Sequence, residues 1–196
     1  MDPHLDVAAF ILAGGRSTRM GTDKAFVTFA GRTLLARALN VARSVTSDVS
    51  IVGDPIKFSP FAPVIEDLVP GCGPLAGIHA ALRASTAEFN LILAVDMPFV
   101  SPALLHFLIS RAQESASAIV TVPRSARGWQ PLCAIYRRQF GVAAEKALRA
   151  GHYKIDALFA PPETQAIEVL ALEQAGFASD IFRNLNTPEE LAKAHE

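Results

Sequence analysis

The sequence predicts an α/β protein, a three-layer α/β/α sandwich with a mostly parallel sheet. The first observation is a set of short apolar runs without polar alternation, such as residues 7–12 and 91–95. The second is that amphipathic stretches of helical spacing separate these runs. Uninterrupted apolar strands that alternate with helices are typical of parallel sheets covered on both faces. The length of 196 residues, without a repeat or a low-complexity linker, predicts one domain over residues 1–196.

The individual elements follow from these patterns. Thr33 is the expected N-cap of the first helix, and Ser101 followed by Pro102 opens another. Strands are expected at residues 7–12, 49–52, 64–65, 91–95, 118–122 and 132–136. Helices are expected at residues 34–45, 75–84, 102–114 and 138–149.

Composition excludes several classes of protein. Hydrophobic residues make up 51% of the chain and charged residues 19%, which excludes a disordered chain. A net charge of −1 argues against binding nucleic acid or anionic membrane through bulk charge, and no apolar stretch has the length of a membrane span. The two cysteines, far apart, indicate reduced thiols in the cytoplasm, and the five histidines lack metal-ligand spacing.

Residues 12–24 form a glycine-rich, basic segment directly after the first strand. Consecutive glycines let backbone N–H groups approach an anion, and Arg16, Arg19 and Lys24 add positive charge. The segment is neither a Walker A loop nor a Gly-x-Gly-x-x-Gly fingerprint. A plain glycine turn with solvated charges is the alternative, but the three basic residues in a neutral protein favour a phosphate site.

Two aspartates follow other expected strands. Asp67 comes after the strand at residues 64–65, and Asp96 follows the most apolar strand of the chain. Ligands of parallel sheets bind beyond the carboxyl ends of the strands, where both carboxylates are expected. Each aspartate could instead only end a strand or start a turn.

The glycine-rich segment, Leu-Ala-Gly-Gly-x-Ser-x-Arg-Met-Gly-x-Asp-Lys at 12–24, resembles the first motif of the molybdenum cofactor guanylyltransferase (MobA) family. Four later segments resemble further motifs of that family in the same order, at residues 64–67 with 73–77, 96–99, 130–132 and 184–191. Each motif is modest alone, and their common order over nearly the whole chain is specific.

The resemblance implies a Rossmann-like nucleotide-diphospho-sugar transferase fold and transfer of GMP from GTP to molybdopterin, with release of pyrophosphate. Cytidylyl transfer to the same cofactor, nucleotide transfer to a sugar phosphate, and a non-catalytic nucleotide- or cofactor-binding carrier are the alternatives. Transient contact with cofactor delivery proteins or molybdenum apoenzymes is also implied. A first motif of Leu-Ala-Gly-Gly, rather than Leu-Ala-Ala-Gly, is similar to the guanylyl branch.

The resemblance also assigns residues. Arg19, Lys24 and Asp96 are the expected catalytic residues, and Mg²⁺ is the expected cofactor, bound by Asp96 and Asn186. The expected GTP-binding residues are Leu12, Ala13, Gly14, Gly15, Lys24, Asp67, Gly73, Pro74 and Asp96. Asn186, which precedes Thr-Pro-Glu, is equally a good helix cap.

Two segments of the sequence do not receive a side-chain role from the resemblance. The family often has an asparagine at the end of the second strand, where this chain has Val52-Gly53. On the acceptor side, Arg124, Arg127 and Trp129 either meet a pterin ring and its phosphate or belong to a surface loop.

Overall fold

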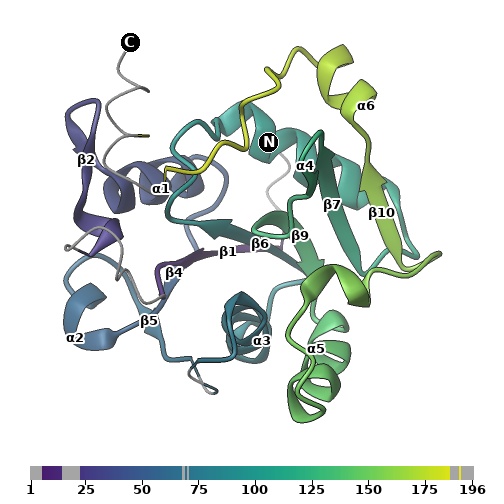
Figure 1. Cartoon of the computed structure of the whole chain (residues 1–196), viewed down its shortest axis with the longest axis horizontal. Coiled ribbons are helices and arrows are strands. Elements are labelled where there is room, and N and C mark those ends of the chain that lie inside the picture. Colours follow the sequence, from purple (N-terminus) through teal and green to yellow (C-terminus); the bar gives the residue numbers. More distant parts are fainter. Residues whose placement is uncertain (1–5, 15–22, 68, 70, 186–189, 191–196) are drawn as a thin grey trace.

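The structure is a computed structural model that describes residues 6–14, 23–67, 69, 71–185 and 190. A twisted sheet crosses the middle of the molecule, with helices above and below it (Figure 1). Its strands run in the order β10-β7-β9-β6-β1-β4-β5. Their bounds are β1 Val7–Leu12, β4 Val49–Val52, β5 Val64–Ile65, β6 Phe89–Ala94, β7 Val120–Ser125, β9 Cys133–Arg137 and β10 Thr164–Ile167.

The predicted mostly parallel sheet is confirmed, and within the strand order above β9 is reversed. β1 pairs in parallel with β4 and β6, β4 with β5, and β7 with β10. β9 runs antiparallel to both of its neighbours, β6 and β7. The carboxyl ends of β5, β4, β1 and β6 therefore meet at one edge of the sheet.

Helices cover both faces of the sheet, as the three-layer prediction requires. The alternation along β1 shows why: Val7, Ala9 and Ile11 face one core, whereas Ala8, Phe10 and Leu12 face another. The first core is closed by α1 Leu34–Arg43 and α4 Pro102–Glu114, and the second by α3 Pro74–Ala84 and α5 Phe140–Arg149. All six residues of β1 are buried, which explains its apolar sequence.

The expected helix starts are confirmed by their caps. The Thr33 side chain accepts a hydrogen bond from the Ala36 amide, and Ser101 accepts one from the Leu104 amide. The predicted bounds of β1, β4, β5 and α4 agree with the structure, and those of the other predicted elements differ by one to three residues. The strand expected at residues 118–122, for example, extends to Ser125 because it continues into a hairpin.

Several short elements have no signal of their own in the sequence. β2 Thr28–Phe29 and β3 Arg32–Thr33 form a hairpin whose turn holds Ala30 and Gly31 at positive φ. The other short elements are η1 Lys24–Phe26, α2 Pro55–Phe58, β8 Gly128–Trp129, η2 Ile155–Leu158 and α6 Val169–Gln174. Such two- to six-residue elements depend on tertiary contacts more than on local propensity.

Both cysteines are free, in agreement with the prediction of reduced thiols. Complete burial raises the pKa of the Cys133 thiol to about 12, so Cys133 is an inert core residue. Within the described part of the chain, the helices are all too short or too polar to cross a membrane.

Candidate functional site

The end of β1 is held at the centre of the carboxyl edge. The Ala13 amide donates to the Val52 carbonyl at 3.0 Å, and the Val95 amide donates to the Leu12 carbonyl at 3.1 Å. These bonds tie the chain between β4 and β6 and leave Gly14 exposed beyond them. A Cβ on Gly14 would meet only the Val52 carbonyl oxygen, at 3.9 Å, so the protein itself leaves room there.

Lys24 and Asp96 form an ion pair at this edge. The Lys24 ammonium lies 2.5 Å from Oδ2 of Asp96, and about one sixth of each side chain is exposed, 17% and 16%. Lys24 is placed by η1, which the Asp23 side chain caps through the Ala25 amide. Two of the three residues expected to be catalytic thus meet although 72 positions separate them.

The C-terminal segment closes around Asp96 from the other side. Nδ2 of Asn184 donates to Oδ1 of Asp96 at 3.3 Å, and the Leu185 amide donates to the Asp96 carbonyl at 3.0 Å. Leu185 is completely buried and anchors the segment. Asn184 therefore supports the carboxylate directly, a contact that the sequence did not predict because the resemblance assigns Asn186 in the same motif.

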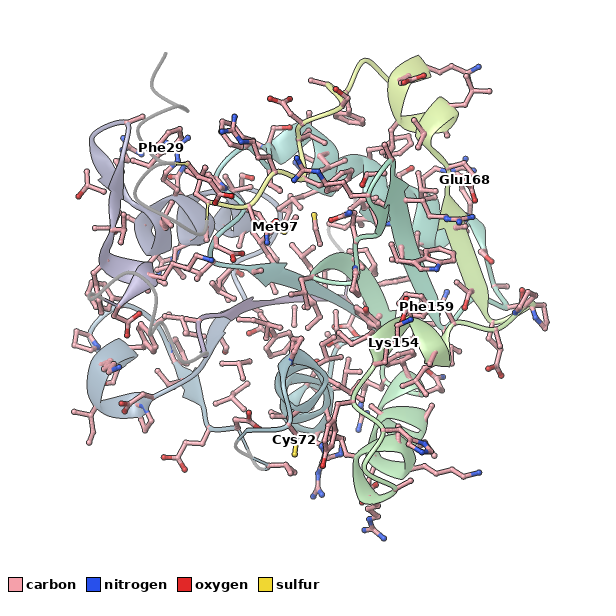
Figure 2. The ribbon with its side chains drawn as sticks, viewed as in Figure 1. Phe29, Cys72, Met97, Lys154, Phe159 and Glu168 are labelled. Carbon is pink, nitrogen blue, oxygen red and sulfur yellow. The ribbon has the colours of Figure 1, made fainter. Side chains whose placement is uncertain are left out.

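Aromatic and basic side chains brace the turn after Asp96. Phe99 packs edge-on against Phe29 of β2, with ring centroids 5.6 Å apart, and Arg183 lies over the Phe99 ring. Arg37 donates to the Pro98 carbonyl and stacks on Phe29. Figure 2 shows Phe29 and Met97 on this side of the sheet and Cys72 on the opposite side. The β2–β3 hairpin, absent from the sequence prediction, thus stiffens the loop that carries Asp96.

The second predicted motif lies at the same edge, beyond β5 and before α3. Gly73 has φ +73°, a conformation that favours glycine, and Pro74 opens the helix. In the first turn of α3, Pro74 has no N–H group and the Ala76 amide donates to the Gly73 carbonyl at 3.2 Å, so this turn offers an anion the Leu75 amide. Asp67 accepts a hydrogen bond from the Val69 amide at 2.9 Å, so its carboxylate also shapes this loop.

The chain has Val52-Gly53 at the end of the second predicted strand, where the family often has an asparagine, and this difference has a steric cause. A Cβ on Gly53 would lie 2.9 Å from two ring carbons of Phe58. Phe58 is the last residue of α2, and its side chain is buried in the core. A side chain at position 53 would have to displace this ring. The Phe58 ring therefore occupies the space that a side chain would need.

The remaining predicted residues, Gly15, Arg16, Arg19 and Asn186, lie outside the described residues. The described ones come together from separate elements. Leu12, Ala13 and Gly14 end β1, Lys24 contacts Asp96 beyond β6, and Asp67, Gly73 and Pro74 flank the start of α3.

Residues 9–167 match the sequence model of the MobA-like NTP transferase domain. The chain belongs to the MobA-like NTP transferase family. It is 35% identical over 191 residues to a molybdenum cofactor guanylyltransferase of Desulfosudis oleivorans, an alignment that covers 96% of this chain and 94% of the relative. The family predicted from the motifs is thereby confirmed, and so is the prediction that the chain is a nucleotidyltransferase.

Solved structures agree with this family membership. The molybdopterin-guanine dinucleotide biosynthesis protein A of Archaeoglobus fulgidus superposes with a TM-score of 0.81 at 29% identity, over 95% of this chain and 96% of that one. The 2-C-methyl-D-erythritol 4-phosphate cytidylyltransferase of Thermus thermophilus gives 0.68 at 20% identity, over 96% of each chain. The second likeness shows that the predicted Rossmann-like nucleotidyltransferase fold is correct.

The donors at this edge of the MobA-like domain fit a magnesium ion. Mg²⁺ often takes one or two protein carboxylates and completes its shell with phosphate oxygens and water. The Asp96 carboxylate has that chemistry, and its partner Lys24 is itself a residue suited to phosphate. Among the described residues, acidic, cysteine and histidine side chains do not gather into a group of three or more that could hold a metal ion.

The segment at residues 124–129 is a hairpin rather than an irregular loop. β8 pairs with β7, and the Arg124 guanidinium lies 4.6 Å from the centroid of the Trp129 ring. Trp129 packs edge-on against Phe159, and Arg124 pairs with Glu168 at 3.4 Å. Figure 2 places Phe159 and Glu168 at the β10 half of the sheet. The hairpin thus presents a cation stacked on an aromatic face.

Proposed function

We propose that this chain transfers GMP from GTP to a phosphate of molybdopterin. The observation that carries the proposal is the Lys24–Asp96 pair at the carboxyl edge, beside the glycine that ends β1. A relative with the printed name molybdenum cofactor guanylyltransferase, aligned over 96% of the chain, supports the choice of reaction. A phosphate oxygen of the acceptor would attack the α-phosphorus of GTP, and the bond to the departing pyrophosphate would break.

Both reactants are polyanions, so binding and charge neutralisation dominate what the protein must supply. Lys24 would bind the triphosphate as a point charge, because its ammonium already lies at the edge where ligands of parallel sheets bind. The Leu75 amide at the start of α3 and the backbone of Gly14 would bind further phosphate oxygens, while Leu12 and Ala13, whose amide already bonds to the Val52 carbonyl, would line the nucleotide site. In the same proposal Gly15 and Arg19 complete the first motif.

Asp96 would hold Mg²⁺, with Asn184 fixing the orientation of the carboxylate through its bond to Oδ1. When bound, the ion supplies neutralisation of the triphosphate charge. Asn186 remains our proposal for a second ligand, two positions beyond Asn184. Asp67, whose carboxylate shapes the turn before α3, would act on the nucleotide chiefly through that turn.

Guanylyl transfer is favoured over cytidylyl transfer by the space at Gly14. The nearest protein atom to a Cβ there would be 3.9 Å away, so the absence of a side chain leaves a gap for a ligand rather than relieving a clash. A purine needs more room than a pyrimidine. A pure carrier would have no need of a lysine and a carboxylate in contact at the nucleotide edge.

We further propose that residues 1–196 act as one nucleotidyltransferase domain, with GTP and molybdopterin as substrates. Transient contact with cofactor delivery proteins or molybdenum apoenzymes belongs to the same proposal. The two free thiols support a cytoplasmic location.

The test is pyrophosphate release from each of GTP, CTP and ATP, measured with molybdopterin and Mg²⁺. We expect GTP to be preferred by at least about 10-fold in kcat/KM. Sugar phosphates in place of molybdopterin serve as the matched control, and they should give no release above background. A preference for CTP, or release only with a sugar phosphate, would overturn the proposal.

A further inference from the structure

A second charged region lies away from the nucleotide edge, in a groove between α3 and α5. The groove has a volume of about 490 Å³, within the range of roughly 300–1,000 Å³ typical of small-molecule sites. It is lined by His79, Leu82, Arg83, Arg138, Gln139, Gly141, Val142 and Glu145. None of these residues belongs to the motifs that indicate nucleotide transfer.

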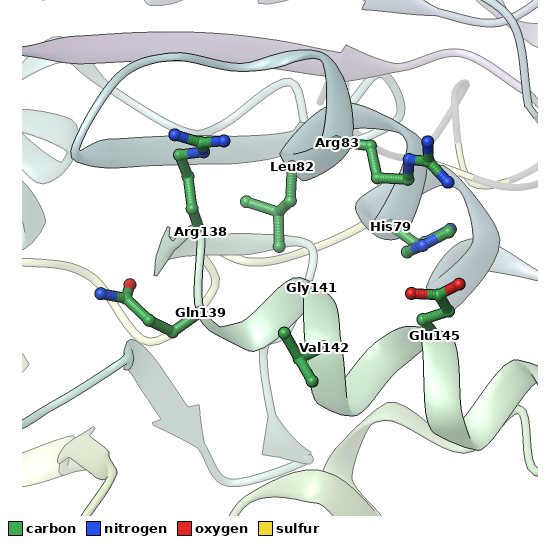
Figure 3. Close-up of a pocket in the computed structure, with 8 residues that line it drawn as sticks. All are labelled: His79, Leu82, Arg83, Arg138, Gln139, Gly141, Val142 and Glu145. Carbon is green, nitrogen blue, oxygen red and sulfur yellow. The ribbon is translucent and has the colours of Figure 1, made fainter.

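The lining is polar at its ends and apolar between them. Figure 3 shows Arg138 and Gln139 at one end and Arg83, His79 and Glu145 at the other. Leu82, Gly141 and Val142 lie between the two ends. A Cβ on Gly141 would lie 3.6 Å from Cβ of Leu82, in ordinary van der Waals contact, so α5 packs closely on α3 at the middle of the groove.

His79 is the polar group that the fold leaves unsatisfied. Only 5% of its surface is exposed, yet neither Nδ1 nor Nε2 has a hydrogen-bond partner among the described residues. A buried polar group without a partner is costly, which makes such a side chain a marker of a missing ligand. His79 belongs to the groove lining, so a molecule bound in the groove would lie against its side chain.

The charges around His79 favour an anion. The side chains of Arg83 and Arg138 form no ion pair with a described residue, whereas the Glu145 carboxylate is neutralised by Arg149 at 2.6 Å. Gln139, the N-cap of α5, also lines the groove, so the positive end of that helix dipole lies there, although the Gly141 and Val142 amides already donate to the Arg138 and Gln139 carbonyls.

We infer that the α3/α5 groove is a second ligand site, for a small molecule that carries a phosphate or carboxylate group. Arg83 and Arg138 supply the positive charge, His79 donates or accepts one hydrogen bond, and Leu82 with Val142 contacts the apolar part of the ligand. The site is separate from nucleotide transfer, because its residues come from the second half of α3 and the start of α5 rather than from the carboxyl edge.

The protonation of His79 gives a local readout. Burial lowers the pKa of His79, and the nearby charges act in both directions: Glu145 and Asp67 raise the pKa, while Arg83 and Arg149 lower it. An oxyanion bound against the imidazole adds a negative neighbour and should raise this pKa. The ring signals of His79 in NMR spectra therefore report binding in the groove without any measurement of activity.

The experiment is a titration of the full chain with inorganic phosphate and, separately, with malonate, at constant ionic strength set with NaCl. We expect saturable shifts of the His79 ring signals with at least one anion. The anion with the lower Kd indicates whether the natural ligand carries a phosphate or a carboxylate group. Arg83→Gln and Arg138→Gln should each raise the Kd at least about 10-fold. Both arginines are exposed, so these variants keep the fold.

Lys146→Gln is the matched control, since it removes one exposed positive charge from the same helix outside the groove. Its Kd should stay within about twofold of the wild type. Val142→Glu, which adds a carboxylate at an exposed rim position, should weaken binding as the arginine variants do. Shifts that never saturate, or a Kd that changes equally in Lys146→Gln and the arginine variants, would overturn the inference.

Discussion

Helix α3 touches two charged regions that differ in how their side chains are paired. At its start, the nucleotide edge joins Lys24, Asp96 and Asn184 through contacts that span 72 and 88 positions of the chain. Along its second half, the groove holds two arginines and a buried histidine without such partners among the described residues. Pairing fixes the geometry of the first region in advance, whereas the second would be completed only by a ligand.

This contrast separates what substitutions should do in the two regions. Changes at the nucleotide edge remove both a functional charge and a contact that holds the loop after β6. Changes in the groove remove charges that support no other part of the fold. Activity should therefore respond to substitutions in the first region, and anion binding to substitutions of the arginines in the second.

The largest effect is expected for Asp96→Asn. The substitution keeps the shape and the bond from Asn184 but removes the negative charge, so Mg²⁺-dependent product formation should fall on the order of 10³-fold. Thermal unfolding should show a modest loss of Tm, because a neutral amide at position 96 would face the Lys24 ammonium in place of a carboxylate. An active variant, or activity of the wild type without any divalent metal, would make Asp96 a purely structural residue.

Lys24→Ala comes next. Loss of one charge-assisted bond to phosphate, about 1.5–3 kcal/mol, should lower kcat/KM for GTP roughly 10- to 200-fold. Lys57→Ala is the control, because Lys57 pairs with Asp23 in the adjoining loop and is half-exposed. Unchanged turnover of correctly folded Lys24→Ala at subsaturating GTP would remove the lysine from the site.

Much of the nucleotide edge could be predicted from the sequence because its residues follow buried strands directly. Leu12, Asp67 and Asp96 each end or follow an apolar run, and parallel strands bring their carboxyl ends to one edge. The choice between Asn184 and Asn186 could not be made in this way. Which asparagine reaches Asp96 depends on where buried Leu185 anchors the segment.

The groove had no comparable signal. Its residues come from 79–83 and 138–145, two helices whose apolar faces are typical of ordinary packing against a sheet. His79 in particular has neither ligand spacing nor a polar neighbour in the sequence that marks it. Likewise, nothing in the sequence at Gly53 predicts the Phe58 ring that fills the space beside it.

Gly14→Ala should test where base specificity arises. A methyl group fits against the Val52 carbonyl at 3.9 Å, so the fold should be unchanged. We expect the preference for GTP over CTP to shrink by a few-fold up to about 10-fold. The ratio of kcat/KM values for the two nucleotides measures this, and an unaltered ratio would place the specificity elsewhere.

A smaller effect is expected for Asn184→Ala. Removing the hydrogen bond to Oδ1 of Asp96 leaves the carboxylate less well oriented. Since the lost bond joins a neutral side chain to a charged group, we expect the apparent Mg²⁺ affinity to fall about 10-fold. The Mg²⁺ dependence of the rate distinguishes this from a general loss of folding. A variant with normal Mg²⁺ dependence and a reduced maximal rate would contradict a positioning role.

The smallest effect concerns His79 and pH. Because burial lowers the pKa of His79 below 6.5, the unfolded chain takes up its proton first, and stability should fall as pH drops from about 7 toward 5. The His79→Leu variant has neither the titrating imidazole nor its unsatisfied nitrogens. Its free energy of unfolding should therefore be higher by about 1–2 kcal/mol and should fall less as the pH drops. Urea unfolding at pH 7 and pH 5 checks both parts, and equal pH slopes in the two proteins would refute the assignment.

The most direct measurement is a crystal structure of the chain with Mg²⁺ and a GTP analogue that resists cleavage at the α-phosphorus. Our account predicts the triphosphate within hydrogen-bond distance of the Lys24 ammonium and the start of α3, with the metal on the Asp96 carboxylate. It also predicts that the α3/α5 groove holds no part of the nucleotide. A triphosphate bound to Arg83 and Arg138, or a metal away from Asp96, would contradict the account.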